Sequence, residues 1–355
     1  MNKFLLHIIS GIIRIYFLFK NHRLFNFLFL SASDGDFIIL SPELYRPRYL
    51  AGDGIIKDLH NYNSLKDKGK KVAVKSNLKN INSKNKKSIL FQGSKFLNTM
   101  GFDDHSSALR SISRQAVKEF DKVSPNFHEA CLWENKGYMH EVFEKNDIPS
   151  PKTHVMNITN YSFNELANIL NEKVFLIKKL NSRSSEGIYK ISSNQDLEKA
   201  KKDLNLSRDV ILQKLVNMNK DLRVIIVNDE IVLHYWRINN HTEWKPTSTS
   251  HGSSVDFDFF PEKWRSFIMK VFYKLEIRTG AFDICWEADD LSSTPLFLEV
   301  SPLYQPNPKP IGSKSLNYGL WKKSLSFFKN GYINQHIETI KTIQEKFIES
   351  FLKER

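Results

Sequence analysis

Hydrophobic positions along the chain follow two different periods, one typical of strands and one typical of helices. Short apolar runs bounded by Gly, Pro, Asn or Asp predict strands at 36–42, 70–74 and 87–93. Apolar residues at helical spacing predict helices at 106–120 and 126–146. The first part of this pattern predicts a small α/β domain over residues 31–127.

Two β-rich blocks follow. Strand-like runs and a helix at 194–204 place the first block at 128–205, and five further strand-like runs place the second at 206–320. The tail, 321–355, predicts an amphipathic helix docked on the body. Its apolar positions recur at helical spacing: Ile333, Ile337, Ile340, Ile343, Phe347 and Phe351.

The first thirty residues are apolar and basic. The run from 4 to 19 is interrupted by His7 and Arg14 and is short for a membrane-spanning helix. A narrow polar stripe predicts an amphipathic helix over 3–21; it consists of Lys3, His7, Ser10, Arg14 and Asn21. Two interpretations stay open. The helix lies on the inner face of a membrane, with Lys20, His22 and Arg23 near anionic headgroups, or the stripe faces water and the rest packs on the core.

Composition restricts the class of protein. Hydrophobic residues make up 41% and charged residues 26%, which is typical of a globular chain. The two cysteines, Cys131 and Cys285, have no metal-site spacing and fit a reducing, cytoplasmic location. The net charge of +13 indicates an acidic partner. We interpret the lysine cluster at 64–88 as a solvated surface and expect no nucleic-acid partner.

One carboxylate lies where a charge is costly. Glu299 follows the apolar run 295–298, which predicts a buried strand. The segment 280–300 predicts a β-hairpin, and a turn centred on Leu291 places Asp283 opposite Glu299 on one sheet face. Two opposed carboxylates repel unless a hard cation such as Mg²⁺ lies between them; Ser301 points to the same face. The alternative is that one or both face solvent.

At this hairpin the chain resembles the ATP-grasp superfamily. The segment "FDICWEADDLSSTPLFLEVS" is similar to the superfamily's magnesium-binding pattern D…LEVN. The resemblance implies that Asp283 and Glu299 bind the Mg²⁺ of ATP. The third ligand is Ser301, where asparagine is usual, or Asn307 in the following loop.

Other segments match in the superfamily's order, over roughly 130–310. "WENKGYMHEVFEKNDIPSPKT" and "FLIKKL" resemble the segments that carry the two phosphate-binding lysines, which implies Lys136 and Lys178, with Lys179 as the neighbour. "NSRSSEGIYKI" resembles the loop that covers the phosphates, and "VILQKLV" resembles the hinge strand that holds adenine. The loop residues implied are Ser184, Ser185 and Gly187, and those of the hinge are Gln213, Lys214, Leu215 and Val216.

"DLRVIIVNDEIVLHYWRI" resembles a segment of the amino-acid ligases, which implies a nucleotide-site role for Asp221 and places Arg223 and Arg237 on the acyl phosphate. Strand geometry restricts this interpretation. A two-residue turn at 228–229 would pair Arg223 with His234 on one face and turn Arg237 to the other, unless a β-bulge intervenes.

The fold class we predict is α/β: an ATP-grasp fold whose two α+β subdomains clamp ATP, preceded by the small α/β domain. The resemblance implies an ATP- and Mg²⁺-dependent ligase that joins a carboxylate to an amine, or to a thiol, through an acyl phosphate. The chain is similar to members of the superfamily that are linked to bacterial surface-polysaccharide synthesis and attach amino acids to sugar acids. This resemblance implies small-molecule or sugar-linked substrates as partners. The alternative is a non-catalytic module that binds a nucleotide or a polyanion.

Overall fold

The computed structural model describes residues 3–29, 34–41, 44, 50, 52–77, 87–91, 105–133, 135–181, 187–204, 209–249, 251–312, 318–323 and 330–353. The chain forms two compact units. The first combines residues 1–130 with 303–355, and the second spans 131–302. Each unit has its own sheets and its own core, so the two are described separately.

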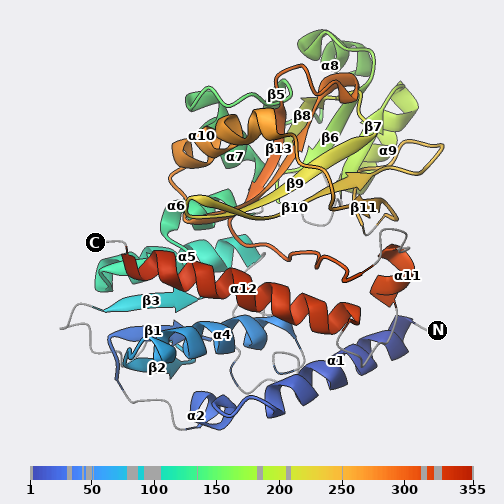
Figure 1. The fold of residues 1–355 in the computed structure, drawn as a ribbon. Helices are drawn as coiled ribbons and strands as arrows, with labels where there is room; N and C mark the ends of the chain where they lie inside the picture. Colours follow the sequence, from blue (N-terminus) through green and yellow to red (C-terminus); the bar gives the residue numbers. More distant parts are fainter. Residues whose placement is uncertain are drawn as a thin grey trace. The chain divides into compact units, whose positions relative to one another are not determined.

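The first unit is built on a parallel sheet (Figure 1). Its strands are β1 (Phe37–Leu40), β2 (Val72–Lys75), β3 (Ser88–Phe91) and β4 (Lys122–Ser124), in the order β2-β1-β3-β4. The three predicted strands are present, whereas β4 and the helix α4 (Asp53–Asp67) were not predicted; α5 (His105–Glu119) lies where a helix was expected. The parallel order requires crossover connections, and α4 supplies the one between β1 and β2.

The C-terminal tail belongs to the first unit. Helix α12 (Tyr332–Lys353) packs along α4 (Figure 1), and a short helix, α11 (Tyr318–Lys323), precedes it. All six apolar positions of the predicted helix in the tail are buried: Ile333, Ile337, Ile340, Ile343, Phe347 and Phe351. Burial of this stripe is what holds the tail on the unit.

The N-terminal helix α1 (Lys3–Phe19), followed by α2 (Leu24–Leu28), is present, and it corrects the interpretation in which the polar stripe faces water and the rest packs on the core. The stripe residue Arg14 does not face water, because its Nε donates to Asp53 Oδ1 at 2.8 Å. Ile12 and Phe19 point outward, with 51% and 78% of their surface exposed. No helix in the described part of the chain is long and apolar enough to cross a membrane.

The second unit contains two sheets with separate cores. One sheet has the order β5-β8-β6-β7 and pairs antiparallel throughout. Its strands are β5 (Thr153–Met156), β6 (Phe175–Lys179), β7 (Ile188–Ile191) and β8 (Val210–Lys214). Helices α8 (Phe163–Leu170) and α9 (Asn194–Leu204) cover one face. A capping box at Ser162 and Glu165 fixes the start of α8.

The other sheet has the order β11-β10-β9-β12-β13. Its strands are β9 (Lys220–Val227), β10 (Glu230–Ile238), β11 (Ser254–Asp256), β12 (Thr279–Cys285) and β13 (Leu296–Ser301). Helix α7 (Lys136–Lys145) and helix α10 (Arg265–Lys274) pack on one face. That face is apolar because alternate strand residues such as Leu222, Val224 and Phe282 point to it.

The helix expected at 126–146 is divided in two. Helix α6 (Phe127–Leu132) ends before Asn135, whose side chain accepts a hydrogen bond from Tyr138 N at 3.3 Å and caps α7. An asparagine at this position offers an N-cap that competes with a continuous helix. The break places Lys136 at the first turn of α7.

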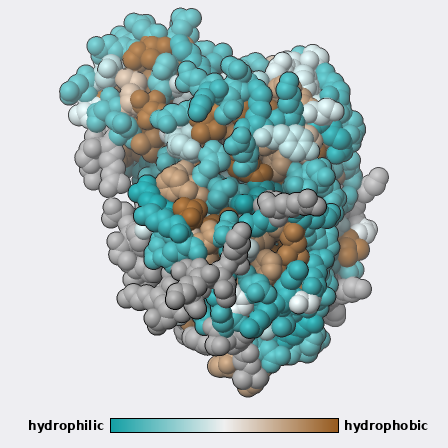
Figure 2. Space-filling view, turned by 90° about the vertical axis from the view of Figure 1, so that its left-hand side faces the viewer, coloured by the Kyte–Doolittle hydropathy of each residue, from teal (hydrophilic) through white to brown (hydrophobic). Residues whose placement is uncertain are grey.

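Figure 2 shows one face of the protein, on which hydrophobic patches are interrupted by hydrophilic side chains.

Candidate functional site

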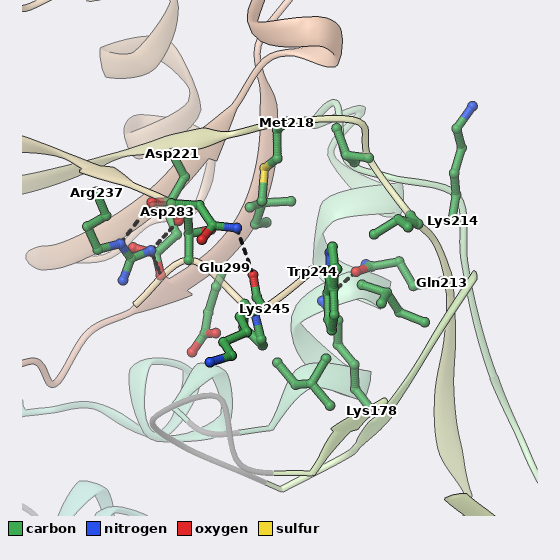
Figure 3. A pocket seen from close by; sticks show the side chains of 18 of the residues that line it. Lys178, Gln213, Lys214, Met218, Asp221, Arg237, Trp244, Lys245, Asp283 and Glu299 are labelled. Carbon is green, nitrogen blue, oxygen red and sulfur yellow. Dashed lines mark hydrogen bonds and ion pairs between the residues drawn. The ribbon is translucent and has the colours of Figure 1, made fainter. Parts of the chain in front are cut away.

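A pocket lies in the second unit, lined by residues of both sheets and of α7 (Figure 3). The space between its walls is about 770 Å³, including the part open to solvent. Its polar lining includes Lys136, Lys178, Gln213, Asp221, Arg237, Lys245, Asp283 and Glu299. Figure 3 shows Asp221, Arg237, Asp283 and Glu299 at one end and Lys178, Gln213 and Trp244 at the other.

Strand alternation explains the polar face of the five-stranded sheet. Leu222, Val224 and Ile226 of β9 point into the helix-covered core, so Asp221 and Arg223 point to the opposite face. Asp283 of β12 pairs with Arg223, and Glu299 of β13 pairs with Asp283. The predicted pairing of Asp283 with Glu299 is therefore confirmed. Directly opposed residues share a face, so these charges gather on one side.

A β-bulge brings Arg237 to the same face. The register shifts between Ile231 and Leu233, so that Val232 has no opposite residue and Arg237 pairs with Asp221. Arg223 then lies opposite Tyr235. The expectation that Arg223 and His234 share a face is wrong, because His234 pairs with Val224 instead. The sequence allowed Arg223 and Arg237 to share a face only if a bulge intervened, and the structure contains that bulge.

The charges on this face form a closely paired cluster. Arg237 Nε donates to Asp221 Oδ1 at 2.8 Å, and its Nη2 contacts both Asp221 and Asp283, the latter at 2.9 Å. Arg223 Nε lies 2.9 Å from Asp283 Oδ1. Burial disfavours the charged Asp283 carboxylate, yet Arg223 and Arg237 outweigh it and hold the pKa of Asp283 below its ordinary value. Burial raises the pKa of Asp221.

Glu299 is the least compensated carboxylate of the face. Its side chain is 31% exposed, and its ion pair is to Lys136, with Nζ 3.8 Å from Oε2. The amine of Lys136 itself is buried, with a side-chain exposure of 8%. A carboxylate at the pocket wall beside a buried lysine is suited to a ligand that carries both a cation and anionic groups.

Asp283 and Glu299 fit a magnesium ion that arrives with a nucleotide. Mg²⁺ usually takes one or two carboxylates and completes its octahedron with phosphate oxygens and water. The described residues include no group of three or more His, Cys, Asp or Glu side chains able to hold a metal.

Lys178 is held at the other end of the pocket by a buried network. Its Nζ donates to Gln213 Oε1 at 2.5 Å, while Gln213 Nε2 donates to Thr153 Oγ1 at 2.8 Å and lies 3.2 Å from His140 Nε2. Since the amide nitrogen is a donor, His140 Nε2 accepts and its proton lies on Nδ1. Burial and the charges of Lys178 and Lys136 lower the pKa of His140 to about 3, so the ring is neutral.

The lysine itself has an altered proton affinity. Burial, then the charge of Lys136, lowers the pKa of Lys178 to about 8. The next residue, Lys179, is exposed and does not line the pocket. Its side chain lies over Gly187, where a Cβ would come within 2.7 Å of Lys179 Cγ and Cδ and where φ is +68°. Glycine is therefore required at 187 for both reasons.

The segment that follows the end of β8 supplies backbone to the pocket wall. Lys214, Leu215 and Val216 all line the pocket. The Lys214 amine pairs with Glu172 at 2.9 Å, and Glu172 is not a pocket residue, so the side chain leads away from the pocket. What Lys214 offers the pocket is therefore its backbone and stem.

Several predicted residues do not line the pocket. Arg223, Gly187 and Ser301 are not among its lining residues, although Arg223 contacts Asp283. Ser301 is buried and pairs with Ala281 in the ladder. Ser184 and Ser185 lie outside the described residues. Asn307 belongs to the first unit, and its position relative to the pocket is not defined.

Sequence reasoning missed several lining or supporting residues, among them Trp244, Lys245 and His140. Trp244 and Lys245 line the pocket from the loop between β10 and β11, and a tryptophan and a lysine beside a proline in a polar loop were the available signal. His140 holds Gln213 and lies four residues after Lys136, on the same side of α7. That spacing could have indicated a shared role.

Comparisons with known proteins agree with this geometry. Residues 133–300 match the family described as RimK-like ATP-grasp domain. No curated protein matches the sequence. The D-alanine–D-alanine ligase from Bacillus anthracis is similar over 89% of this chain and 97% of its own, with a TM-score of 0.52 and 11% identity.

Two further solved structures are similar. The RimK domain ATP-grasp protein from Sphaerobacter thermophilus DSM 20745 gives a TM-score of 0.50 at 11% identity, over 74% of this chain and 89% of its own. D-cycloserine synthetase DcsG gives a TM-score of 0.52 at 10% identity, over 87% of this chain and 99% of its own. At these identities the likeness concerns the fold, and the predicted ATP-grasp fold is confirmed.

Proposed function

We propose that the protein is an ATP- and Mg²⁺-dependent ligase that joins a carboxylate to an amine, on the premise that residues 133–300 match the family described as RimK-like ATP-grasp domain. The observation that carries the proposal is the division of the pocket into two ends. Lys178 lies at one end of the pocket and the opposed carboxylates Asp283 and Glu299 lie at the other, with the buried Lys136 beside Glu299. Phosphate groups suit the first end, and a phosphate-bound cation suits the second.

The chemistry consists of two displacements. A substrate carboxylate oxygen attacks the γ-phosphorus of ATP, the bond to the bridging oxygen breaks, and ADP leaves with the electron pair. The amine nitrogen then attacks the carbonyl carbon of the acyl phosphate. The C–O bond breaks, phosphate leaves, and the nitrogen loses a proton to give the amide. A bound Mg²⁺ would supply charge neutralisation on the phosphate oxygens.

The protein's own residues have distinct parts in this scheme. Lys136 and Lys178 hold phosphate oxygens, and Lys178 does so only while protonated, below a pKa of about 8. Asp283 and Glu299 hold the metal. The backbone of Lys214–Val216 borders the nucleotide base. These assignments are supported by the lining of the pocket.

The arginines act differently from each other. Arg237 lines the pocket and can reach an acyl phosphate through the part of its guanidinium that Asp221 and Asp283 leave open. Arg223 does not line the pocket and acts through Asp283, so it is a positioning residue. A fixed, paired guanidinium requires no reorganisation as charge develops.

The test is nucleotide-dependent phosphate release, with amino acids and uronic acids supplied in pools. Hydroxylamine added with the acid pool alone traps an acyl phosphate as a hydroxamate, which identifies the acid before the amine is known. Glu299→Gln should abolish release, and Lys179→Ala, at an exposed neighbour of Lys178, should retain it. If ATP binds but no pool gives release or hydroxamate, the protein is a nucleotide-binding module and not a ligase. The sugar acid of a surface polysaccharide is the acid we would test first.

A further inference from the structure

The N-terminal helix is held on the first unit by the buried Ile13 and Leu18 together with the polar stripe residue Arg14. Arg14 Nε donates to Asp53 Oδ1 at 2.8 Å, and His336 Nε2 lies 3.3 Å from Asp53 Oδ2. Burial disfavours the charged Asp53, yet His336 and Arg14 hold its pKa well below the ordinary value. These contacts connect α1 to α4 and α12 and fix the rotation of α1 about its axis. The helix therefore cannot turn its exposed apolar side inward without breaking a partly buried ion pair.

The opposite side of α1 is apolar and exposed. Five side chains of α1 fall within an arc of roughly 100° because they recur at intervals of three and four, and two phenylalanines of α2 add to them. Together they form the α1–α2 face: Ile8, Ile12, Ile15, Tyr16, Phe19, Phe25 and Phe29. Of the 14 large hydrophobic side chains exposed in the described part of the chain, these seven lie within 22 consecutive residues.

An exposed apolar cluster of this kind differs from ordinary surface hydrophobics. Single exposed apolar side chains are normal, whereas a contiguous face indicates an interaction site. The Phe25 and Phe29 rings lie 5.3 Å apart, so the apolar side chains at α2 and its C-cap are themselves clustered. The partner must be apolar where it meets these rings.

Charge identifies the class of partner. The first unit contains 30 of the 52 Lys and Arg residues but only 15 of the 39 Asp and Glu residues, so its net charge is +15. The second unit contains 22 Lys and Arg residues and 24 Asp and Glu residues, so its net charge is −2. The positive charge of the protein therefore belongs to the unit with the α1–α2 face. Lys20 marks the edge of that face, with Nζ 4.6 Å from the centre of the Tyr16 ring. Apolar rings bordered by lysine match the boundary between acyl chains and anionic headgroups.

We propose that the α1–α2 face binds the surface of an anionic lipid bilayer, with α1 lying in the plane of the interface. Since no described helix can span a bilayer, the binding is peripheral. The bulky side chains enter the acyl region, and Lys20 remains among the headgroups. A second copy of the chain would also cover an apolar face, but a homodimer would bring two units of net +15 together.

The test is flotation of the full-length protein with vesicles. The wild type should float with mixed phosphatidylcholine–phosphatidylglycerol vesicles, float less at high salt, and remain unbound with phosphatidylcholine alone. Ile12→Glu/Phe19→Glu, which alters two outward-facing side chains, should lower the bound fraction at least about tenfold. Phe259→Glu/Tyr273→Glu is the matched control, because both residues are exposed in the second unit and the change in charge is the same.

A second variant, Phe25→Ser/Phe29→Ser, removes the part of the face that lies on α2 and should also weaken flotation. Circular dichroism and the urea midpoint establish that each variant is folded. The proposal is overturned if the wild type does not float with anionic vesicles, or if both variants of the face float as well as the control. It is also overturned if the wild type is a dimer that ignores vesicles and Ile12→Glu/Phe19→Glu makes it a monomer, since the face is then an interface between copies.

Discussion

Asp283 and Glu299 lie directly opposite each other on β12 and β13, but the structure gives them different surroundings. Two arginines pair with Asp283, whereas Glu299 is 31% exposed and has one ion pair, at 3.8 Å. The repulsion expected between the two carboxylates is therefore largely offset by charges that the sequence pattern did not place there. The two residues should respond differently to neutralisation.

We expect Glu299→Gln to lose Mg²⁺-dependent turnover while the free energy of unfolding changes by less than about 1 kcal/mol, because the lost ion pair is long and partly solvated. Asp283→Asn should also lose turnover but destabilise the protein by about 3–5 kcal/mol, because it leaves Arg223 and Arg237 buried without a full counter-charge. Urea denaturation measures both. Equal stability of the two variants would show that the arginine cluster is not the dominant environment of Asp283.

Lys178→Ala should weaken ATP binding by about 10- to 100-fold, the usual effect of losing a charge-assisted hydrogen bond. Lys179→Ala is the matched control, because it removes the same charge from an exposed position of the same strand. Isothermal titration calorimetry measures both affinities. A larger loss for Lys179→Ala would mean that the phosphates lie on the other face of the sheet.

ATP affinity should depend on pH through Lys178. Its pKa in the folded, nucleotide-free protein is about 8, lowered from an ordinary 10.5. Phosphate favours the protonated amine, so the affinity should be constant below pH 8 and fall by up to about tenfold per pH unit above it. Lys178→Arg, which stays charged, should remove this decline. An unchanged profile in that variant would assign the titration to another group.

The same shift affects stability with a defined sign. Between pH 8 and 10.5 the unfolded chain keeps the Lys178 proton that the folded, nucleotide-free protein has lost. Stability from this group therefore rises with pH across that window, and the cost of holding the charged amine is fully present below pH 8.

The attachment of α1 can be tested through Asp53. Asp53→Asn should destabilise the first unit by about 1–3 kcal/mol, because a partly buried carboxylate that pairs with Arg14 and contacts His336 is lost. Asp67→Asn is the control, since Asp67 pairs with Arg23 but its side chain is 65% exposed, and it should cost less than about 1 kcal/mol. Thermal or urea unfolding distinguishes the two. If the variants are equally stable, the Arg14–Asp53 pair does not hold the helix.

The hairpin turn and strand alternation together predicted that Asp283 and Glu299 are opposed, and the structure pairs them beside a register shift between Asp283 and Ile284 that the pattern did not predict. They could not predict the bulge at Val232, because an apolar residue between Ile231 and Leu233 leaves the pattern unchanged. The arginine cluster depends on that bulge and was missed with it. The pocket residues Trp244 and Lys245 lie in a loop without a periodic signal.

The N-terminal helix shows a second limit. Its amphipathic pattern predicted that α1 is a helix, but one of the two interpretations assigned the polar stripe to water. The partner of Arg14 is Asp53, 39 positions later in the chain, and no local pattern indicates a contact at that separation. Which side of an amphipathic helix faces the protein is decided by tertiary partners.

The bulge in β10 gives the strand a spare residue, with a consequence for how the chain can change in length. Losing one residue near Val232 would let the ladder straighten and would leave Arg237 opposite Asp221. An added residue at this point could not be absorbed by straightening the ladder. Every later side chain of β10 would exchange faces, and Arg237 would enter the apolar core. The strand should therefore accept a shortening at this point more readily than a lengthening.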